Sequence, residues 1–308
     1  MSQTEGAQGV QGAPTPMGSE DPKELGAKPA FPAQPQRPPG IEAEMTPRPD
    51  YGEQSYISGA GRLLDKVALI TGGDSGIGRA VALAYAREGA DVVISYLNEE
   101  ADAQETARVI HEAGRRCVAV PGDISQEPHC RQLVERVFDA FGRLDILVNN
   151  AAFQMTHGGI EEVPSEEFDF TFRTNVYAMF WLCRAALPRM GTGGAIINTA
   201  SVQAYNPSPA LLAYAATKGA IVTFSKALAQ EAIGRGVRVN VVAPGPVWTP
   251  LIPATMPPEQ ASEFGKQTPM GRPAQPAELA PAFVFLASQE SSYIVGEVVG
   301  VTGGKPLP

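Results

Sequence analysis

Short apolar runs alternate with helical stretches along most of this chain, and no other sequence feature limits its possible folds as strongly. Seven β-branched runs follow Leu64, at 67–71, 91–95, 117–121, 145–149, 195–199, 237–242 and 298–302. Runs of this kind are typical of strands buried on both faces of a sheet. Helical segments lie between them, such as 126–141 with its apolar residues at helical spacing. The alternation predicts an α/β fold with a doubly wound, seven-stranded parallel sheet.

The chain divides into an arm and one large domain. Residues 1–50 are rich in Pro, Gly, Gln and Ala, so they cannot bury enough apolar surface to fold alone. They are predicted to be an extended N-terminal arm, either disordered or strapped along a surface. Residues 51–64 form a docking segment, with five side chains that could pack on the domain: Tyr51, Tyr56, Ile57, Leu63 and Leu64. Residues 65–308 form the single domain.

Composition excludes several classes of function. The net charge is −9 and no cluster of Lys or Arg offsets it, which argues against a nucleic-acid partner. The three cysteines lack paired spacing and the histidines lack partner spacing, so no disulfide framework and no metal site is expected. No apolar run is long enough to span a membrane, and the first residues lack a signal-peptide pattern. The expected compartment is the cytoplasm.

A glycine-rich turn follows the first run directly. The sequence TGGDSGIG, residues 71–78, lies between that strand and the helical RAVALAYAREG. Glycines at 72, 76 and 78 allow a tight turn, close approach of the backbone to a phosphate, and packing of the helix against the sheet. The N–H groups at a helix start can hold a pyrophosphate whatever the net charge of the protein. This context predicts a dinucleotide site of the Rossmann type.

A tyrosine and a lysine four positions apart suggest acid–base chemistry. Tyr214 and Lys218 lie in YAATK, within the stretch 211–233 that is expected to be one long helix. An adjacent ammonium should draw the pKa of a phenol down toward the working range, which would make Tyr214 an acid/base. Such a pair is common and usually structural when it stands alone. Ser201 follows the fifth strand, thirteen positions before Tyr214, where its hydroxyl could orient a carbonyl oxygen.

Further polar residues occur where strands end. Gly122 and Asp123 end the third strand, and NNAA at 149–152 ends the fourth. Asn175 lies among apolar residues of a helix and needs hydrogen-bond partners if it is buried. PGPVWT at 244–249 follows the sixth strand. Ligands of a parallel sheet bind beyond the carboxyl ends of its strands, so these residues should share one site.

These motifs, in this order and spacing, resemble the single-domain branch of the short-chain dehydrogenase/reductase family over about residues 64–304. The resemblance implies that Tyr214 is the acid/base, that Lys218 lowers its pKa and holds the nicotinamide ribose, that Ser201 positions the substrate, and that Asn175 holds a water of a proton relay. It also implies a set of NAD(P)-binding residues: Gly72, Ser75, Gly76, Ile77, Gly78, Tyr96, Asp123, Ile124, Asn150, Ala151, Ala152, Tyr214, Lys218, Pro244, Gly245, Val247 and Thr249.

Two features qualify this resemblance. The family motif Asn-Asn-Ala-Gly ends here in Ala152, whose methyl group could crowd the cofactor slightly. The acidic residue that usually selects NAD is missing, because Ser95 and Tyr96 occupy the end of the second strand. The choice between NAD and NADP therefore stays open. The long arm is similar to that of a subgroup of uncharacterised and general-stress oxidoreductases near the glucose dehydrogenases.

The expected substrate is a small alcohol or carbonyl compound, such as a sugar, an aldehyde or a ketone. The Pro-rich loop 248–275 is expected to form a lid, with Trp248, Leu251, Ile252 and Met256 as an apolar cover. The facing loop supplies a second set of side chains, Phe153, Gln154, Met155 and His157. An epimerase or dehydratase and a nucleotide-sensing or scaffold protein are the alternative functions. The resemblance also implies a homotetramer, and the arm could strap neighbouring subunits.

Overall fold

The structure is a computed structural model that describes residues 23, 26–53, 55–56 and 59–308. The first part of the expected arm, residues 1–22 and 24–25, lies outside the described residues. The same holds for residues 54, 57 and 58 of the expected docking segment. Within the described residues, no helix is long and apolar enough to cross a membrane.

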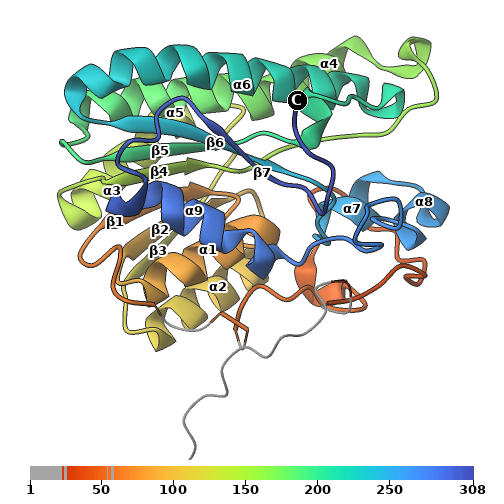
Figure 1. Ribbon diagram of the computed structural model, residues 1–308, viewed down its shortest axis with the longest axis horizontal. Coiled ribbons are helices and arrows are strands. Elements are labelled where there is room, and N and C mark those ends of the chain that lie inside the picture. The colour runs from red at the N-terminus through yellow and green to blue at the C-terminus, as the bar shows by residue number, and fades with distance from the viewer. Residues whose placement is uncertain (1–22, 24–25, 54, 57–58) are drawn as a thin grey trace, which may run out of the picture.

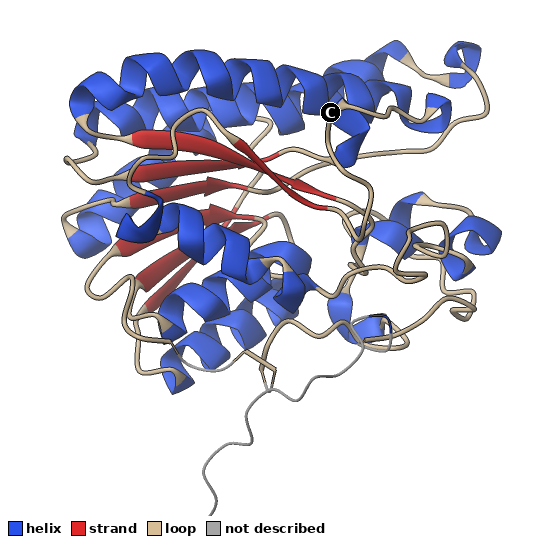
Figure 2. Cartoon of the chain, in the orientation of Figure 1, coloured by secondary structure: helices blue, strands red, loops and turns tan. Residues whose placement is uncertain are grey.

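A seven-stranded parallel sheet forms the centre of the molecule (Figures 1 and 2). The strand order is β3-β2-β1-β4-β5-β6-β7, so the direction of winding reverses between β1 and β4. All residues of β1, β2, β4, β5 and β6 are buried, which explains their continuous apolar sequences. The strands are β1 (Val67–Thr71), β2 (Asp91–Tyr96), β3 (Cys117–Pro121), β4 (Ile146–Asn149), β5 (Ala195–Thr199), β6 (Arg238–Pro244) and β7 (Val298–Val301).

Helices cover both faces of the sheet (Figure 1), which confirms the predicted doubly wound α/β fold. One apolar cluster joins the sheet to α1 (Gly76–Arg87), α2 (Glu100–Glu112) and α9 (Ala280–Ala287). A second cluster joins the other face to α3 (Glu127–Phe141), α5 (Ala178–Ala186) and α6 (Leu212–Ala232). Helix α4 (Ser165–Phe172) continues into α5 through the π-helical turn Arg173–Tyr177. Two short helices, α7 (Leu251–Thr255) and α8 (Pro258–Ser262), lie in the loop after β6.

Two strands are longer than the sequence predicted, and both differences concern the site. Tyr96 is the last residue of β2 because it pairs with Pro121 of β3. Pro244 is the last residue of β6 because it pairs with Val301 of β7. The predicted motif 244–249 therefore begins inside the strand. Both residues stand at the carboxyl edge of the sheet, where a parallel sheet places its ligands.

The described part of the arm lies against the loop that carries α7 and α8, where Figure 1 draws it in red and orange. The N–H of Phe31 donates to the Ser262 carbonyl at 3.0 Å, and the N–H of Gln36 donates to the Pro253 carbonyl at 3.0 Å. These bonds join the arm to the loop of its own chain.

The docking segment only partly follows the expectation. Tyr51 and Leu63 are buried in the cluster around α1, and Tyr56 packs on its edge. Leu64 is 63% exposed, because the chain turns sharply at Asp65, which has a positive φ of 57°. Ile57 lies outside the described residues.

Candidate functional site

A cavity of about 390 Å³ opens at the carboxyl ends of the strands, next to the point where the strand order reverses. The cavity brings together most of the site residues predicted from the sequence. Those that line it are Gly72, Ser75, Gly76, Ile77, Tyr96, Asp123, Ile124, Asn150, Ala151, Ala152, Ser201, Tyr214, Lys218, Pro244, Gly245, Val247 and Thr249. Gly78 and Asn175 do not line it.

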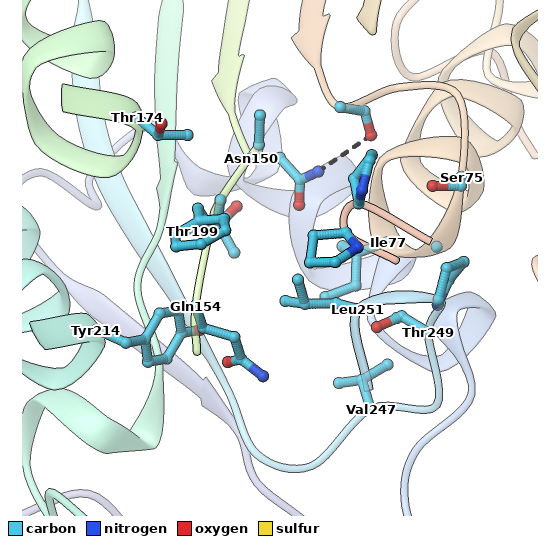
Figure 3. A pocket seen from close by; sticks show the side chains of 18 of the residues that line it. Ser75, Ile77, Asn150, Gln154, Thr174, Thr199, Tyr214, Val247, Thr249 and Leu251 are labelled. Atoms are coloured by element: carbon cyan, nitrogen blue, oxygen red, sulfur yellow. Dashed lines mark hydrogen bonds between the residues drawn. The ribbon is translucent and has the colours of Figure 1, made fainter. Parts of the chain in front are cut away.

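The cavity has two facing sides. Figure 3 shows Tyr214 and Thr199 on one side, and Ser75, Thr249 and Val247 on the other. The first side comes from β5 and α6, whereas the second comes from the start of α1 and the loop after β6. An elongated ligand that reaches from the start of α1 to Tyr214 would lie between them.

The glycine-rich turn has the backbone that its sequence predicted. Gly72 and Gly76 have positive φ values of 60° and 51°, which L-residues with a Cβ rarely adopt. Gly78 lies inside the first turn of α1, where a Cβ would stand 1.8 Å from the Gly72 carbonyl oxygen. Its role is therefore to let the helix pack on the turn, which is why it does not line the cavity.

Asn150 joins the turn to the end of β4. Its Nδ2 donates to the carbonyl oxygens of Thr71 and Gly72 at 3.1 and 3.3 Å, and its backbone N–H donates to Thr71 Oγ1 at 3.0 Å. These bonds hold the two strands that flank the switch point in one geometry. Ala152 lines the cavity as the family's glycine would.

Lys218 is buried, with 2% of its surface exposed, at the inner end of the cavity. Its Nζ donates to the Thr199 carbonyl at 2.8 Å and lies 5.2 Å from the centre of the Tyr214 ring. Nζ carries up to three donors, and the Thr199 carbonyl is its only hydrogen-bond acceptor among the described residues. The remaining donors are free for a ligand hydroxyl.

Burial controls the pKa values of this pair more strongly than the sequence predicted. Burial raises the pKa of Tyr214 to about 12, although a hydrogen bond with Ser201 opposes the rise. Burial also lowers the pKa of Lys218 to about 7, because an ammonium loses its hydration there. The largest effect on the phenol pKa is therefore burial, and the net shift is upward rather than downward as the sequence predicted. Tyr214 is a neutral phenol at neutral pH.

Asn175 lies in the π-helical turn between α4 and α5, where it is 3% exposed. Its Oδ1 accepts the Phe153 N–H at 2.8 Å, while its Nδ2 donates to the Phe153 carbonyl at 2.9 Å and to Thr217 Oγ1 at 3.0 Å. The buried amide thus finds the partners it requires. These bonds fix the loop after β4 against α6.

The sequence did not predict two acidic residues at the end of the cavity near β2. Asp74 and Glu99 both line the cavity beside Tyr96. Burial raises the pKa of Asp74 to about 7, and the nearby charge of Glu99 adds to this rise. The glycine motif contains Asp74, but nothing in the motif indicates that its carboxyl is buried.

The structure places three of the four residues that were expected to form an apolar cover at the cavity. Leu251, Ile252 and Met256 line the cavity. Trp248 does not; it is fully buried behind the lid, where its ring stacks on Phe31 of the arm with 3.9 Å between ring centres. No sequence pattern indicates that Phe31 is the partner of Trp248, because the two residues are more than 200 positions apart.

The facing loop contributes Phe153 and Gln154 to the cavity, but not Met155 or His157. His157 instead contacts Glu167 of α4, with 2.6 Å between Nε2 and Oε1. Three apolar residues that the sequence did not predict also line the cavity: Phe170, Leu211 and Phe264. Only long-range packing places them there.

The residues of the cavity fit a dinucleotide. At the turn, Gly72 and Gly76 line the cavity with backbone alone and have positive φ values, which leaves room for a phosphate to approach the backbone closely. Lys218 keeps free donors beside Thr199, whose buried Oγ1 has no hydrogen-bond partner. Such unpaired buried polar groups are rare unless a ligand or water completes them.

Comparisons with known proteins agree with this geometry. Residues 72–305 match the family model described as enoyl-(acyl carrier protein) reductase. An uncharacterised oxidoreductase of Escherichia coli (strain K12) is 54% identical over 279 residues, which cover 90% of this chain and 95% of that protein. NADPH-dependent aldehyde reductase 1, chloroplastic, of Arabidopsis thaliana is 46% identical over 273 residues, covering 86% of this chain and 94% of that protein.

Solved structures are similar as well. The crystal structure of a short chain dehydrogenase from Burkholderia cenocepacia in complex with NADP has a TM-score of 0.74 and 34% identity. The match covers 79% of this chain and 98% of that chain. Fold and site together define an α/β oxidoreductase of the Rossmann type. Within that class, the chain belongs to the short-chain dehydrogenase/reductase family, as its motifs predicted.

Proposed function

We propose that this protein is an NAD(P)-dependent oxidoreductase that reduces a small carbonyl compound to an alcohol, or catalyses the reverse reaction. The observation that carries the proposal is the shared cavity, which holds the glycine-rich turn at one end and Ser201, Tyr214 and Lys218 at the other. Two similar proteins support the cofactor, since the Burkholderia structure contains NADP and the Arabidopsis relative is called NADPH-dependent. The nicotinamide, when bound, supplies or accepts the hydride.

The side chains perform the proton transfer. The Ser201 hydroxyl hydrogen-bonds the substrate oxygen and orients it toward Tyr214. During reduction the carbonyl carbon gains a hydride and the Tyr214 hydroxyl gives its proton to the oxygen, which leaves a phenolate. The Lys218 ammonium stabilises that phenolate until solvent protonates it again. A phenol with a pKa of about 12 is protonated at neutral pH, so the site is ready for reduction.

The remaining predicted residues bind the cofactor and position it. The amides at the start of α1 hold the pyrophosphate, and Asp123 and Ile124 flank the adenine. Asn150, Ala151 and Ala152 line the middle of the cofactor. Asn175 is proposed to support the proton relay by holding the loop after β4 against α6, through its hydrogen bonds to Phe153 and Thr217.

The side chains that line the cavity favour an apolar carbonyl compound over a sugar as the substrate. The apolar side chains of the lining include Phe153, Phe170, Leu211, Met256 and Phe264, and its neutral polar side chains include Gln154, Gln203 and Thr174. A sugar would bury hydroxyl groups against these rings without enough partners, and each unpaired group costs about 1–3 kcal/mol. An aldehyde or ketone with an apolar substituent leaves only the carbonyl oxygen to be satisfied, by Ser201 and Tyr214.

The test is to follow nicotinamide absorbance with NADH and NADPH against a panel of aldehydes, ketones and sugars. We expect turnover with apolar aldehydes, and Tyr214→Phe should lower kcat by about 10²-fold or more because it removes the proton donor. Equilibrium binding of the cofactor to Tyr214→Phe serves as the control and should stay within about twofold of wild type. Turnover that survives in the Phe variant would contradict the mechanism. Cofactor binding without turnover on any substrate would favour the sensing or scaffold alternative.

A further inference from the structure

The arm reaches the cavity itself. Pro38 and Pro39 line it, on the side of the glycine-rich turn and of Thr249 and Pro250. Gly40 follows them with a positive φ of 91° and packs so closely on the lid that a Cβ would stand 2.5 Å from the Pro250 carbonyl oxygen. The arm therefore forms a wall of the site at the place where the lid and the turn meet.

A buried carboxylate fixes this wall to the start of α1. Glu42 has no exposed surface, and its Oε2 accepts the Gly76 N–H at 2.6 Å. Its Oε1 pairs with Arg79 at 2.5 Å, and its own N–H donates to Asp102 Oδ2 at 2.9 Å. Burial raises the pKa of Glu42, and the fully buried Arg79 beside it opposes this rise by stabilising the ionised carboxylate. One side chain of the arm thus holds both the first residue of α1 and the nearby cation.

The arm is fixed to the lid as firmly as to the helix. Phe31 stacks on Trp248, and Trp248 Nε1 donates to the Pro47 carbonyl at 2.9 Å. The Gln36 N–H donates to the Pro253 carbonyl at 3.0 Å. Residues 31–47 therefore bridge the start of α1 and the loop after β6, which lie on the same side of the cavity. The gap between these elements is narrow, because a Cβ on Gly76 would lie 3.1 Å from Thr249 Cγ2.

We propose that residues 36–47 form part of the cofactor site. They retain the dinucleotide by contacting its pyrophosphate and adenosine half. Pro38 and Pro39 are the contact residues, while Gly40 and Glu42 are positioning residues that hold them between the turn and the lid. Release of the dinucleotide then requires the bridge to open. The inference rests on the proposed function, because it assumes that the cavity binds NAD(P).

Gly40→Ala tests the bridge from its lid side. The added methyl collides with the Pro250 backbone, so the arm must move away from the lid. Gly61→Ala is the matched control: Gly61 also has a positive φ, of 74°, but a Cβ there would meet no atom of the described residues within 4 Å. Both variants carry the same kind of backbone strain, and only the first disturbs the wall.

The measurements are the release rates of NADH and NADPH by stopped-flow fluorescence and the Kd of ADP-ribose, which lacks the nicotinamide. We expect Gly40→Ala to raise the release rates and the Kd by about fivefold or more, and Gly61→Ala to stay within about twofold of wild type. Equal values for the two variants would overturn the inference alone. A wild-type protein that binds neither dinucleotide would overturn the proposed function and the inference with it.

Glu42→Gln tests the bridge from its helix side, with Glu88→Gln as control. Both carboxylates have fully buried side chains and pair with an arginine, but Glu42 lies at the start of α1 and Glu88 directly follows its end, where it pairs with Arg62. Both variants should lose thermal stability. We expect only Glu42→Gln to raise the Kd of ADP-ribose and to raise the cofactor KM more than it lowers kcat. Equal binding by the two variants would show that Glu42 is merely structural.

Discussion

Burial determines the charges of the reacting groups at the scale of single residues. Tyr214 and Lys218 are both desolvated, which favours the neutral form of each. A neutral phenol suits proton donation. A lysine with a pKa of about 7 is charged only in the acidic half of the usual working range.

This arrangement predicts how reduction depends on pH. The pKa of Lys218 is lowered to about 7, so the ammonium that stabilises the phenolate is present below pH 7 and is lost as the pH rises through 7. We expect kcat/KM for carbonyl reduction to fall above pH 7 by up to about tenfold per pH unit. A pH–rate profile at saturating reduced cofactor measures this fall in kcat/KM. A flat profile between pH 6 and 9 would contradict the role of Lys218.

Asp74 predicts a pH-dependent effect on stability. Its pKa is raised from 3.8 to about 7 by burial, so ionised Asp74 destabilises the folded state above pH 7, and this penalty disappears as the pH falls toward 3.8. Asp74→Asn should therefore raise the Tm at pH 8.5 and have no effect near pH 4. Thermal unfolding across this range measures the difference.

The same variant should bind NADPH more tightly at pH 8.5, since a carboxylate beside the adenosine end repels a 2′-phosphate.

At the scale of elements, the start of α1 depends on one close packing. The helix can approach the glycine-rich turn only because residue 78 has no side chain, whereas the glycines of other helices are free of this constraint. The turn thus fixes the position of α1, and with it the position of the backbone N–H groups at the start of the helix.

Substitution of Gly78 tests this packing. Gly78→Ala places a Cβ 1.8 Å from the Gly72 carbonyl oxygen, so we expect a loss of about 3 kcal/mol in the free energy of unfolding and weaker dinucleotide binding. Gly219→Ala, in the middle of α6 with nothing within 4 Å of its Cβ, should instead stabilise by about 0.5–1 kcal/mol. Chemical denaturation of both variants provides the comparison. Equal stability of the two would contradict the packing argument.

At the scale of the whole molecule, a group of large apolar side chains remains exposed along α4, α5 and α6. Its members are Phe168, Tyr177, Phe180 and Leu212. These helices lie along the top of the molecule in Figure 1. Exposed apolar patches of this kind are typical of protein interfaces. We propose that this face forms an interface of the homotetramer that the family resemblance implies.

Phe180→Glu tests the interface. Phe180 is 40% exposed on α5, and a carboxylate there would be buried without a partner in an assembled oligomer. We expect the variant to have a lower mass in solution than wild type by size-exclusion chromatography with light scattering. Leu64→Glu, which is 63% exposed in the turn before β1, is the control and should keep the wild-type mass. An unchanged mass for Phe180→Glu would exclude this face.

The sequence by itself determined the order of strands and helices, the glycine-rich turn and the spacing of Tyr214 and Lys218. These features are local: strand and helix periodicity, the conformations open to glycine, and the four-residue repeat of a helical face each act within a few residues. Family motifs then extended the prediction to the lining of the cavity. The fold class and the family are confirmed; the roles of the site residues stay predictions.

Only the tertiary structure decided where the arm lies, what Trp248 contacts and which charges the cavity holds. Phe31 and Trp248 are more than 200 positions apart, and no periodicity in either segment indicates that they meet. The pKa values of Asp74, Tyr214 and Lys218 depend on burial, which arises when distant segments close over them. Composition predicted that residues 1–50 cannot fold alone. It could not indicate the surface on which the described part of the arm packs, because that surface forms only when the sheet, the lid and α1 are assembled.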